Sequence, residues 1–419
     1  MYGDVEGLKV LIVGHGAREH AIAKKLAEAD VEMHAAMGRR NPGIAGLSER
    51  VEIMDITDPE AYSRFHGMDI AFIGPEAPLS TGVSDKLRGM GVPVVGPSHA
   101  TARLEWSKSY ARIFLDEQGI EGNPEFSVCR SRGDIVGFLD EHLSVAVKPD
   151  VLTGGKGVKI SGEHLNGTSE VEEYALQCIA NDGLVVLEEC LVGREFTLQA
   201  FTDGSRVEVM PLVRDFKRAY DGDTGPNTGS MGSYSCAHHG LPDLSDESVA
   251  KGIRIMNETI TRLRDSVEPY MGFLYGGFME TEDGVYLIEY NSRLGDPEAM
   301  NVLALLEGSL LDIGWQIVDG RLGKPAFERQ ATVCVYLVPR GYPVNPVRDS
   351  PVTIQTPKNS QLYYASVHEE AGVVRTTGSR SVALLAKGGS VDEARTKVYS
   401  DIPSIRGDLF YRKDIGAGV

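Results

Sequence analysis

Short apolar runs alternate with amphipathic stretches over the first hundred residues of the chain. The runs at 8–13, 69–74 and 92–95 have the length of buried strands, and the stretch that follows the first of them, up to Leu26, repeats its apolar positions at helical spacing. Strands that alternate with helices are typical of a parallel sheet. We therefore expect residues 1–103 to form a doubly wound α/β domain.

The pattern changes after residue 103. Helices are predicted over 104–115 and 251–265, and apolar runs predict strands at 144–149, 158–161, 184–189, 195–201, 272–279 and 285–290. From about residue 324 the chain is rich in strands, with one helix at 391–399. We expect a multidomain α/β and α+β protein whose units are 1–103, 104–326 with a lid subdomain at about 124–190, and a small β-rich unit at 327–419.

Composition narrows the class of partner. The chain has 419 residues and a net charge of −18, from 42 basic and 60 acidic residues. Such a surface argues against nucleic-acid or anionic-membrane binding, so any phosphate site must be locally basic. No apolar run approaches the ~20 residues of a membrane span. The five cysteines are scattered, which predicts a reduced, cytoplasmic location, and the adjacent pair His238-His239 is not favoured as a metal site.

A glycine turn follows the first strand. It reads G-H-G-A-R-E-H at 14–20, where a helix is predicted to begin, and the N–H groups of a helix start point at a bound anion. The dinucleotide pattern G-x-G-x-x-G is not completed, because Glu19 takes the place of the third glycine. A nicotinamide site is therefore disfavoured, and we expect Arg18 and Arg39 to meet one phosphate group.

Two more segments of the first domain fit a ligand site. The turn-rich run N-P-G-I-A-G at 41–46 brings backbone close to a neighbouring group, and Glu76 follows the strand at 69–74. Ligands of open α/β sheets bind beyond the carboxyl ends of the strands, so Glu76 is a candidate contact.

A lysine and a glycine-rich loop predict a lid over phosphates. Lys148 ends one strand, L-T-G-G-K-G-V follows at 152–158, and a second strand begins there. The P-loop pattern G-x-x-x-x-G-K-[ST] is absent, so this is a different phosphate-binding arrangement. Glu188 and Glu189 end the strand at 184–189, either as a solvated strand end or as an edge that holds adenine.

The segment V-Y-L-I-E-Y-N-S-R-L-G-D-P-E at 285–298 carries the candidate metal ligands. Glu289 and Asn291 are two residues apart on a predicted strand, so their side chains share a face. One carboxylate and one amide oxygen suit Mg²⁺, which fills its other positions with water and phosphate. Arg293 stays on that side if the chain remains extended, and a helix is predicted with Pro297 in its first turn. The alternative is a strand with a polar end followed by a capped helix.

The stretch R-D-F-K-R-A-Y-D-G-D-T-G-P-N-T-G-S-M-G-S-Y at 214–234 is the most unusual one. It is rich in Gly, Asp and Thr and too long for an ordinary connector. Such loops are functional or disordered, and the mixture of basic and acidic side chains favours a loop that contacts a substrate.

Taken together, these motifs resemble the phosphoribosylamine–glycine ligase family of ATP-grasp enzymes. The resemblance rests on G-x-G-x-R-E-H at 14–20, P-G-x-A-G at 42–46, G-P-E-A-P-L at 74–79, the lysine and glycine loop at 148–157, D-x-K-R-x-x-D-G-D-T-G-P-N-T-G-x-M-G-x-Y at 215–234, E-x-N-x-R-x-G-D-P-E at 289–298 and Y-R-x-D-I-G at 411–416. The motif at 215–234 is the most specific, whereas the nucleotide-binding motifs are shared with carboxylases and other ligases.

The resemblance implies a role for individual residues. For ATP it points to Lys108, Lys148, Gly154, Gly155, Lys156, Gly157, Glu188, Glu189, Leu191 and Glu195. For the other substrates it points to Gly16, Arg18, Glu19, Asn41, Gly43, Pro75, Glu76, Asp223, Thr224 and Asn227. For the reacting groups it points to Arg293, Asp296, Asp215 and Lys217, and for Mg²⁺ or Mn²⁺ to Glu289 and Asn291.

The resemblance also implies a reaction. Glycine would take the γ-phosphoryl group of ATP to give glycyl phosphate, and the amine of 5-phosphoribosylamine would then displace phosphate. A monomer or a weak homo-oligomer is expected. The number of metal ions is open, because Gly276-Gly277 stands near the position of a first metal carboxylate and Glu280 is one position out of phase. The alternatives are another ATP-grasp ligase or carboxylase, a nicotinamide-dependent oxidoreductase and a nucleotide sensor without activity.

Overall fold

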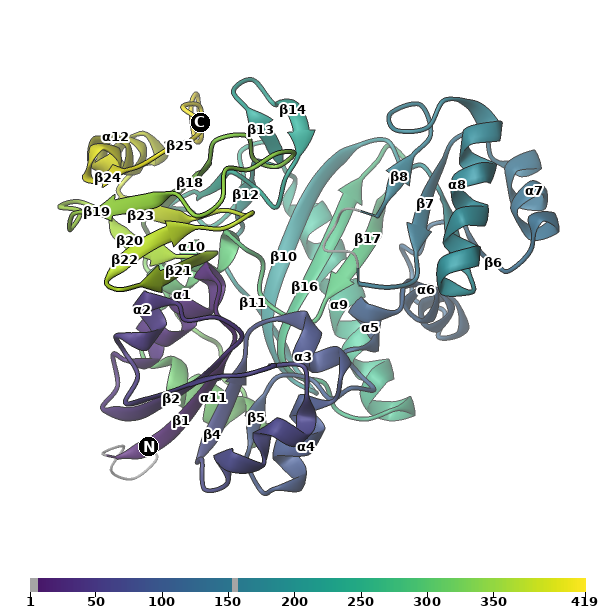
Figure 1. Cartoon of the computed structure of the whole chain (residues 1–419). Helices are drawn as coiled ribbons and strands as arrows, with labels where there is room; N and C mark the ends of the chain where they lie inside the picture. Colours follow the sequence, from purple (N-terminus) through teal and green to yellow (C-terminus); the bar gives the residue numbers. More distant parts are fainter. Residues whose placement is uncertain (1–6, 153–156) are drawn as a thin grey trace.

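The computed structural model describes residues 7–152 and 157–419. Its first unit is a five-stranded parallel sheet in the order β3-β2-β1-β4-β5, with helices on both faces (Figure 1). The strands are β1 (Leu8–Val13), β2 (Val31–Met37), β3 (Arg50–Ile53), β4 (Ile70–Ile73) and β5 (Val94–Val95). The helices are α1 (Ala17–Leu26), α2 (Pro42–Ala45), η1 (Pro59–Phe65), α3 (Glu76–Ser80) and α4 (Val83–Gly89). The doubly wound prediction is confirmed.

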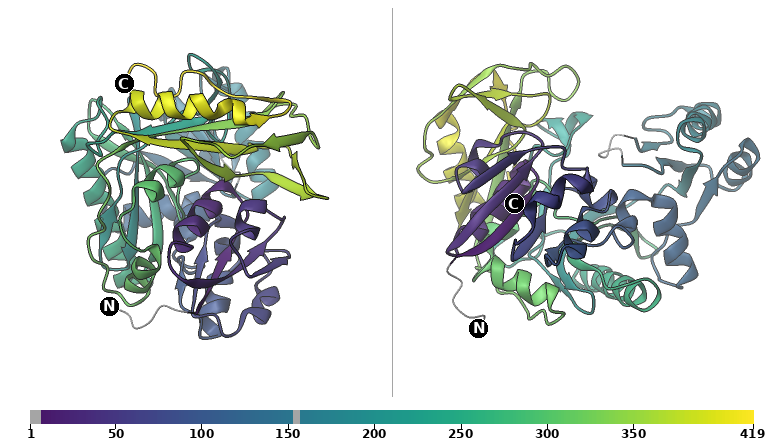
Figure 2. Two further views of the ribbon diagram at one scale, coloured as in Figure 1. Left: turned by 90° about the vertical axis from the view of Figure 1, so that its left-hand side faces the viewer. Right: turned by 60° about the horizontal axis from the view of Figure 1, so that its bottom comes forward.

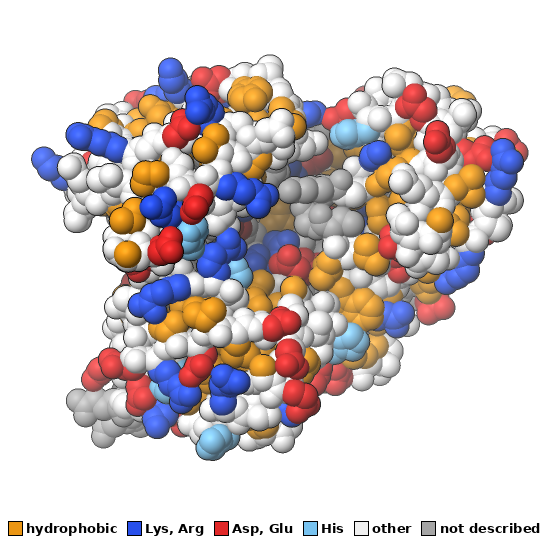
Figure 3. Space-filling model, in the orientation of Figure 1, with side chains coloured by type: hydrophobic (Ala, Val, Ile, Leu, Met, Phe, Trp, Pro, Cys, Tyr) orange, Lys and Arg blue, Asp and Glu red, His pale blue; other side chains and the backbone are white. Residues whose placement is uncertain are grey.

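The lid subdomain stands apart on the right of Figure 1. Its antiparallel sheet has the order β6-β9-β7-β8, and α7 and α8 pack against it. These elements are β6 (Phe126–Cys129), α7 (Arg132–Glu141), β7 (Val145–Pro149), β8 (Lys159–Ile160), α8 (Gly167–Asp182) and β9 (Val185–Glu189). The lid has a hydrophobic cluster of its own, built around Ile135, Val147 and Leu187. Figure 3 shows the molecular surface hollowed between the lid and the rest of the protein.

A second antiparallel sheet forms the floor of this hollow. Its order is β11-β10-β16-β17, from β10 (Arg194–Asp203), β11 (Val207–Val209), β16 (Met271–Glu280) and β17 (Val285–Asn291). Helix α9 (Asp246–Ser266) packs against β11, β16 and β17. Helix α10 (Glu298–Leu305) packs on α1, and α11 (Leu310–Val318) packs on β5 and β10, so both helices tie this unit to the first one.

The C-terminal part is rich in strands, as expected. Its larger sheet has the order β12-β15-β18-β23-β20, with β25 also paired to β18, and a smaller sheet has the order β21-β22-β19-β24. The strands are β12 (Arg214–Asp215), β15 (Gly232–Ser235), β18 (Ala331–Pro339), β19 (Pro351–Ile354), β20 (Gln361–Tyr364), β21 (Val367–Glu370), β22 (Val373–Thr376), β23 (Val382–Gly388), β24 (Ile405–Arg406) and β25 (Leu409–Phe410). Helix α12 (Val391–Asp401) covers one face and η2 (Ile402–Ser404) follows it (Figure 2).

Strands β12 and β15, from the middle of the chain, belong to the C-terminal sheet. One hydrophobic cluster also runs through the first sheet, α10, α11 and the C-terminal sheet, and it includes Ile12, Phe72, Phe201, Leu311 and Tyr336. The three units therefore share a core, whereas the lid does not take part in that cluster. The predicted domain boundaries stay a prediction.

Three local predictions are corrected. The helix expected over 104–115 is two helices, α5 (Arg103–Trp106) and α6 (Lys108–Glu117), because Ser107 is extended and its side chain caps α6 by accepting from the Tyr110 N–H. The segment 214–234 is not an irregular loop, since it contains β12, β15 and the hairpin β13 (Arg218–Tyr220) and β14 (Thr224–Asn227). Pro297 directly precedes α10 instead of lying in its first turn.

Candidate active site

A β-bulge shapes the end of strand β17. Gly277 faces Glu289 and Phe278 faces Leu287 across the strand pair, which leaves Ile288 as the extra residue. Successive carbonyl groups of a regular strand point in opposite directions, but a bulge re-aims them. As a result one guanidinium, that of Arg112 on α6, donates to both Leu287 O (2.9 Å) and Ile288 O (2.6 Å).

The same arginine anchors the lid. Arg112 donates to the two carboxylate oxygens of Glu188 at 2.8 and 2.7 Å, and Lys148 Nζ lies 2.7 Å from Glu188 Oε2 and 3.0 Å from Ile288 O. All three side chains are buried. Burial favours the neutral form of Glu188, but Arg112 and Lys148 outweigh it and lower the pKa of this carboxyl, whereas burial lowers the pKa of Lys148. Glu188 is therefore the counter-ion of two cations, and its contact with adenine stays a prediction.

The other predicted ATP residues lie around the lid and the floor. Lys108 Nζ donates to Val151 O at 3.2 Å, Glu189 Oε1 accepts from Glu125 N at 2.9 Å, and Gly157 O accepts from the Tyr174 hydroxyl at 2.7 Å. Leu191 is half-buried, and Glu195 is exposed and pairs with Lys217 at 3.1 Å. Gly154, Gly155 and Lys156 lie outside the described residues.

The predicted metal ligands are neighbours in space. Asn291 Nδ2 lies 3.4 Å from Glu289 Oε1, so the two side chains share a face as expected. Gly277 lies opposite Glu289, and a Cβ there would be 3.6 Å from Glu289 Cγ, so the absence of a side chain leaves room beside the carboxylate. Glu280 lies elsewhere, hydrogen-bonded to the hydroxyls of Ser245 and Ser248.

These donors fit a hard cation held jointly with phosphate oxygens. Carboxylate and amide oxygens are the ligands that Mg²⁺ prefers, and it commonly takes only one or two of them from the protein. In the described part of the chain no group of three His, Cys, Asp or Glu side chains is placed to hold a metal by itself. A metal–nucleotide complex therefore fits the donor set better than a cage made by the protein alone.

Arg293 lies between two carboxylates from distant segments. Its Nε is 3.3 Å from Glu76 Oε2 at the start of α3 and 3.3 Å from Glu105 Oε1 on α5, and its NH2 donates to Asn291 Oδ1 at 3.0 Å. Burial works to raise the pKa of Glu76, but Arg293 and Arg18 lower it to about 2. Burial raises the pKa of Glu105 to about 7 despite Arg293. Glu105 and Glu76 in turn hold the pKa of Arg293 above its usual value.

The turn that follows is held by the other units of the protein. Arg18 NH1 of the first domain donates to Leu294 O at 3.0 Å, and Gln199 Oε1 of the floor accepts from Gly295 N at 2.7 Å. Glu105 Oε2 accepts from Ser292 N at 2.7 Å.

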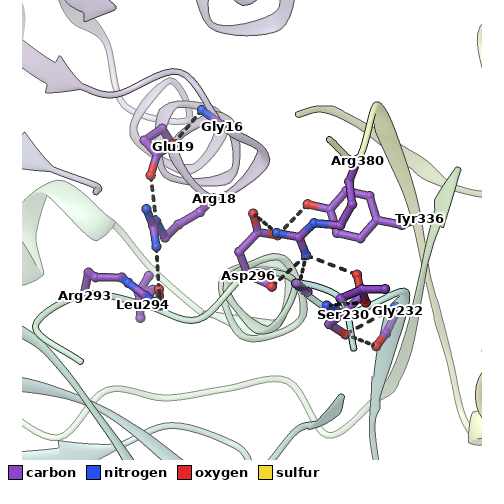
Figure 4. A network of polar contacts seen from close by, with 12 residues as sticks. Gly16, Arg18, Glu19, Ser230, Gly232, Arg293, Leu294, Asp296, Tyr336 and Arg380 are labelled. Atoms are coloured by element: carbon purple, nitrogen blue, oxygen red, sulfur yellow. Dashed lines mark hydrogen bonds and ion pairs between the residues drawn. The ribbon is translucent and has the colours of Figure 1, made fainter. Parts of the chain in front are cut away.

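The C-terminal unit holds Asp296. Arg380 donates to its backbone oxygen at 2.9 Å and to Oδ2 at 3.0 Å, and the Tyr336 hydroxyl donates to Oδ1 at 2.5 Å (Figure 4). Arg380 also donates to the carbonyls of Gly229 and Ser230. Both carboxylate oxygens of Asp296 are thus taken within the protein, and its predicted role in the chemistry stays a prediction.

A side chain of helix α1 occupies the anion position of the glycine turn in the first domain. Glu19 Oε2 accepts from Gly16 N at 2.6 Å, so a carboxylate fills the place at the helix start that a phosphate would take, while Glu19 Oε1 accepts from Arg18 Nε (Figure 4). His15 lies near the predicted phosphate-binding arginines, with its Nε2 3.5 Å from Arg39 NH2. Burial lowers its pKa, Glu19 opposes the shift, and Arg39 and Arg18 add to it, so both cations lie near one imidazole. A shared phosphate stays a prediction.

Three other predicted substrate residues have structural roles. Asn41 caps α2 through its oxygen and donates through Nδ2 to His15 O and Tyr364 O at 3.0 and 2.9 Å. Gly43 packs against His20, whose ring atoms would lie within 2.2–2.7 Å of a Cβ there. Pro75 directly precedes α3 and positions Glu76.

A second charged cluster combines side chains of the floor with Asp215 on strand β12, which belongs to the C-terminal sheet. Asp215 and then Glu195 raise the pKa of Lys217. Glu298 is buried and lies 3.3 Å from the Tyr275 hydroxyl, and burial together with the charge of Asp215 raises the pKa of Glu298 to about 7. Glu298 is therefore, like Glu105, a carboxyl whose pKa is raised to about 7.

The hairpin β13–β14 is fastened by the C-terminal tail. Arg412 is buried and donates to Asp223 Oδ1 at 2.7 Å and to both oxygens of Asp414, and its NH1 donates to Arg218 O at 3.0 Å. Arg218 also reaches Glu163 of the lid at 2.6 Å.

The remaining predicted residues of this hairpin are exposed. Thr224 donates to Asp221 O at 3.0 Å, and Asn227 pairs with Arg218 in the strand register.

Sequence reasoning missed several residues of the site: Glu105, Arg112, Glu298, Tyr336 and Arg380. Arg112 and Glu105 lie among apolar residues of short helices, and a charge on an apolar face was a usable signal. The sequence carries no such signal for Tyr336 and Arg380, because both come from strands and turns far from the site in sequence.

A lid on an antiparallel floor, with a buried lysine near the end of lid strand β7 and Glu-x-Asn at the end of the last floor strand, is the architecture of an ATP-grasp enzyme. Profiles of the N domain, the ATP-grasp (A) domain and the C domain of phosphoribosylglycinamide synthetase match residues 8–105, 106–299 and 332–418. The chain belongs to the phosphoribosylglycinamide synthetase family.

Relatives match over nearly the whole chain. The phosphoribosylamine–glycine ligases of Methanococcus maripaludis and Thermococcus kodakarensis are each 44% identical over 98% of this chain and 96% of their own. The crystal structure of the phosphoribosylamine–glycine ligase of Thermotoga maritima superposes with a TM-score of 0.85 at 29% identity, covering 97% of this chain and 100% of the other.

The fold is shared more widely. Biotin carboxylase of Campylobacter jejuni, in a complex with an ATP analogue, has a TM-score of 0.74 at 12% identity over 98% of this chain and 94% of its own. That likeness concerns the fold alone.

Proposed function

We propose that this protein joins glycine to 5-phosphoribosylamine with ATP, and that the cluster at the end of β17 is where the reaction takes place. The glycine carboxylate attacks the γ-phosphorus, which breaks the bond to ADP and forms glycyl phosphate. The amine of phosphoribosylamine then attacks the acyl carbon, phosphate leaves, and the nitrogen loses a proton as the amide forms. A carboxylate is a poor acyl donor, so this activation is what ATP supplies.

The observation that carries the proposal is the meeting of three units at Arg293. The floor strand supplies Glu289 and Asn291, the first domain supplies Glu76, and the turn from Leu294 onward continues into the segment fastened by the C-terminal unit. Substrates held by different units would meet at this point. Positioning and electrostatic stabilisation are the main sources of catalysis in phosphoryl transfer.

The residues divide the work as follows. Glu289 and Asn291 would hold Mg²⁺ or Mn²⁺, which would screen phosphate charge. The ammonium group of Lys148 would turn from Glu188 to the phosphates of the nucleotide, while Arg112 stays paired with Glu188. The closed lid would exclude water that hydrolyses the acyl phosphate. Lys217 and Asp215 would offer a glycine zwitterion a cation and an anion, since the charge of Asp215 is the main influence that raises the pKa of Lys217.

The supporting comparisons cover the whole chain, and the motif at 215–234 separates this reading from a carboxylase. The hairpin of that motif lies beside the hollow and touches the lid through Arg218. In the described residues no helix is long and apolar enough to cross a membrane, and all five cysteines are free. We propose a cytoplasmic enzyme that acts on small molecules and is a monomer or a weak homo-oligomer.

The test is ADP release with Mg-ATP, glycine and freshly generated phosphoribosylamine, with each omitted in turn. ADP that requires all three supports the proposal. Glycine labelled with ¹⁸O in its carboxylate must pass one labelled oxygen to the released phosphate, because that oxygen bridges carbon and phosphorus in glycyl phosphate. Glu289→Ala is expected to abolish turnover, and Glu282→Ala, on the exposed turn before β17, serves as the matched control.

Two outcomes point elsewhere. ADP release that depends on bicarbonate or another acid in place of glycine would keep the ATP-grasp chemistry and reject the substrate. Release of unlabelled phosphate during amide formation would reject the acyl phosphate.

A further inference from the structure

We infer that Glu105 is a positioning residue of the reaction, which fixes Arg293 and through it the metal-binding amide of Asn291; this rests on the proposed use of Glu289 and Asn291 by the metal–nucleotide complex. Glu105 lies on α5, outside every motif that pointed to function, and its side chain is 7% exposed. A carboxylate buried so deeply needs strong partners.

Both of its oxygens are used on the segment that follows the metal strand. Oε2 accepts from Ser292 N at 2.7 Å, and Oε1 lies 3.3 Å from Arg293 Nε. The first contact holds the backbone one residue after Asn291, and the second holds the side chain two residues after it. Glu105 thus holds the two residues that follow Asn291 and contacts neither metal ligand directly.

The position of Glu105 affects Asn291 through Arg293, because a guanidinium group is rigid and planar. Arg293 Nε lies 3.3 Å from a carboxylate oxygen of both Glu105 and Glu76 and makes no hydrogen bond to the described residues, so the two carboxylates place the guanidinium by charge, and its NH2 donates to Asn291 Oδ1 at 3.0 Å. Asn291 then directs its Nδ2 to Glu289 Oε1 at 3.4 Å. The contacts thus run from the Glu105 carboxylate through Arg293 and Asn291 to Glu289. The last two of these residues are the predicted metal ligands.

A role in stability alone does not explain why Glu105 is present. One guanidinium is neutralised by one carboxylate, and Glu76 already provides it at the same distance from Nε. A second buried carboxylate pays a desolvation cost that an apolar side chain of similar volume would avoid. Alignment of a ligand by an outer partner is the function that such a residue serves at other metal sites, where its loss weakens metal binding or activity by about 10–100-fold.

The test compares Glu105→Gln with Glu117→Gln, an exposed residue at the end of the neighbouring helix α6. Glutamine keeps the volume and an acceptor for Ser292 N but removes the charge beside Arg293. Affinity is measured for ADP alone and for ADP with Mn²⁺, the latter by the paramagnetic signal of bound Mn²⁺. We expect E105Q to bind Mn²⁺–ADP about tenfold more weakly, with metal-free ADP unchanged, and E117Q to match the wild type.

A double-mutant cycle with Arg293→Lys shows whether Glu105 acts through Arg293. The two effects on Mn²⁺–ADP affinity should not add, because either change alone releases Asn291. Should E105Q be recovered unfolded, Glu76→Gln removes the other carboxylate from the same Nε and is expected to weaken the same complex.

The inference is overturned if folded E105Q binds Mn²⁺–ADP like the wild type, if it loses metal-free ADP by the same factor, or if its effect adds fully to that of R293K. It is equally overturned if E105Q is unfolded and E76Q binds like the wild type. None of these results depends on turnover, so they are distinct from a failure of the proposed function, which would show as wild-type protein without ADP release that requires glycine.

Discussion

Lowering the pH tests the contact of the first domain with the C-terminal unit at His20. The Tyr364 N–H donates to His20 Nδ1 at 2.9 Å, and the ring lies between Tyr363 and Tyr364 with centroids 5.7 and 5.8 Å away. Burial, with a smaller contribution from Lys24, lowers the pKa of His20 from 6.5 to about 3. An imidazolium cannot accept the Tyr364 hydrogen bond, so the folded protein keeps His20 neutral.

The sign and size follow from proton linkage. The folded-state pKa lies below the unfolded one, so at intermediate pH the unfolded chain binds a proton that the folded chain does not, and stability falls as the pH falls through 6.5. Each pH unit below the unfolded pKa costs about 1.4 kcal/mol until the folded pKa is reached. At about pH 5 the loss from His20 alone is therefore about 2 kcal/mol, against almost nothing at about pH 7.5.

Other groups titrate in the same range with the opposite sign. The pKa values of Glu105 and Glu298 are raised to about 7, so their contribution is lost as the pH rises and regained as it falls. The wild-type curve alone is therefore not diagnostic, and a difference between two proteins is needed.

The assay is urea unfolding of wild type, His20→Asn and His66→Asn at both pH values. Asparagine offers an oxygen to Tyr364 N and cannot be protonated, so H20N is less stable at neutral pH but should lose about 2 kcal/mol less than wild type on acidification. His66 is exposed, and H66N should follow the wild type. Equal losses in wild type and H20N would refute the burial argument.

Three further perturbations have expected outcomes. Arg112→Met leaves buried Glu188 with one cation, which should cost about 3 kcal/mol of unfolding free energy and speed hydrogen exchange across β9; unchanged exchange there would contradict the anchoring role. Arg412→Met unpairs Asp414, which is 29% exposed, so a loss of about 2 kcal/mol and faster proteolysis of the hairpin at 218–227 are expected, and an unaltered digest would argue against it. Glu163→Gln breaks an exposed ion pair with Arg218 and should change the unfolding free energy by less than about 0.5 kcal/mol, so a larger loss in denaturation would show that this pair is stronger than its exposure implies.

The sequence predicted what depends on local pattern. Strands such as 8–13, and the face shared by Glu289 and Asn291, follow from periodicity and are found in the structure. Position along the chain does not show which charges meet, so the pairing of Glu188 with Arg112 and Lys148 could not be predicted, and its contact with adenine stays a prediction.

Long-range pairing explains the other differences. Arg412 pairs with its neighbour Asp414 and with the distant Asp223, and strand β15 pairs with β18, where Gly232 lies opposite Val335. Asp223 and strand β18 each lie far along the chain from the residues they pair with, and a reading of local sequence does not connect them.

The turn after β17 has a consequence for protein engineering. Its backbone and Asp296 are held by side chains from the first domain, α5, the floor and the C-terminal unit, namely Arg18, Glu105, Gln199 and Arg380. A chimera that exchanges one unit for that of a distant relative must therefore carry over these holding residues together with those they contact. Chimeras that keep the set intact should tolerate wide changes elsewhere, which makes the turn a practical guide to where this chain can be recombined.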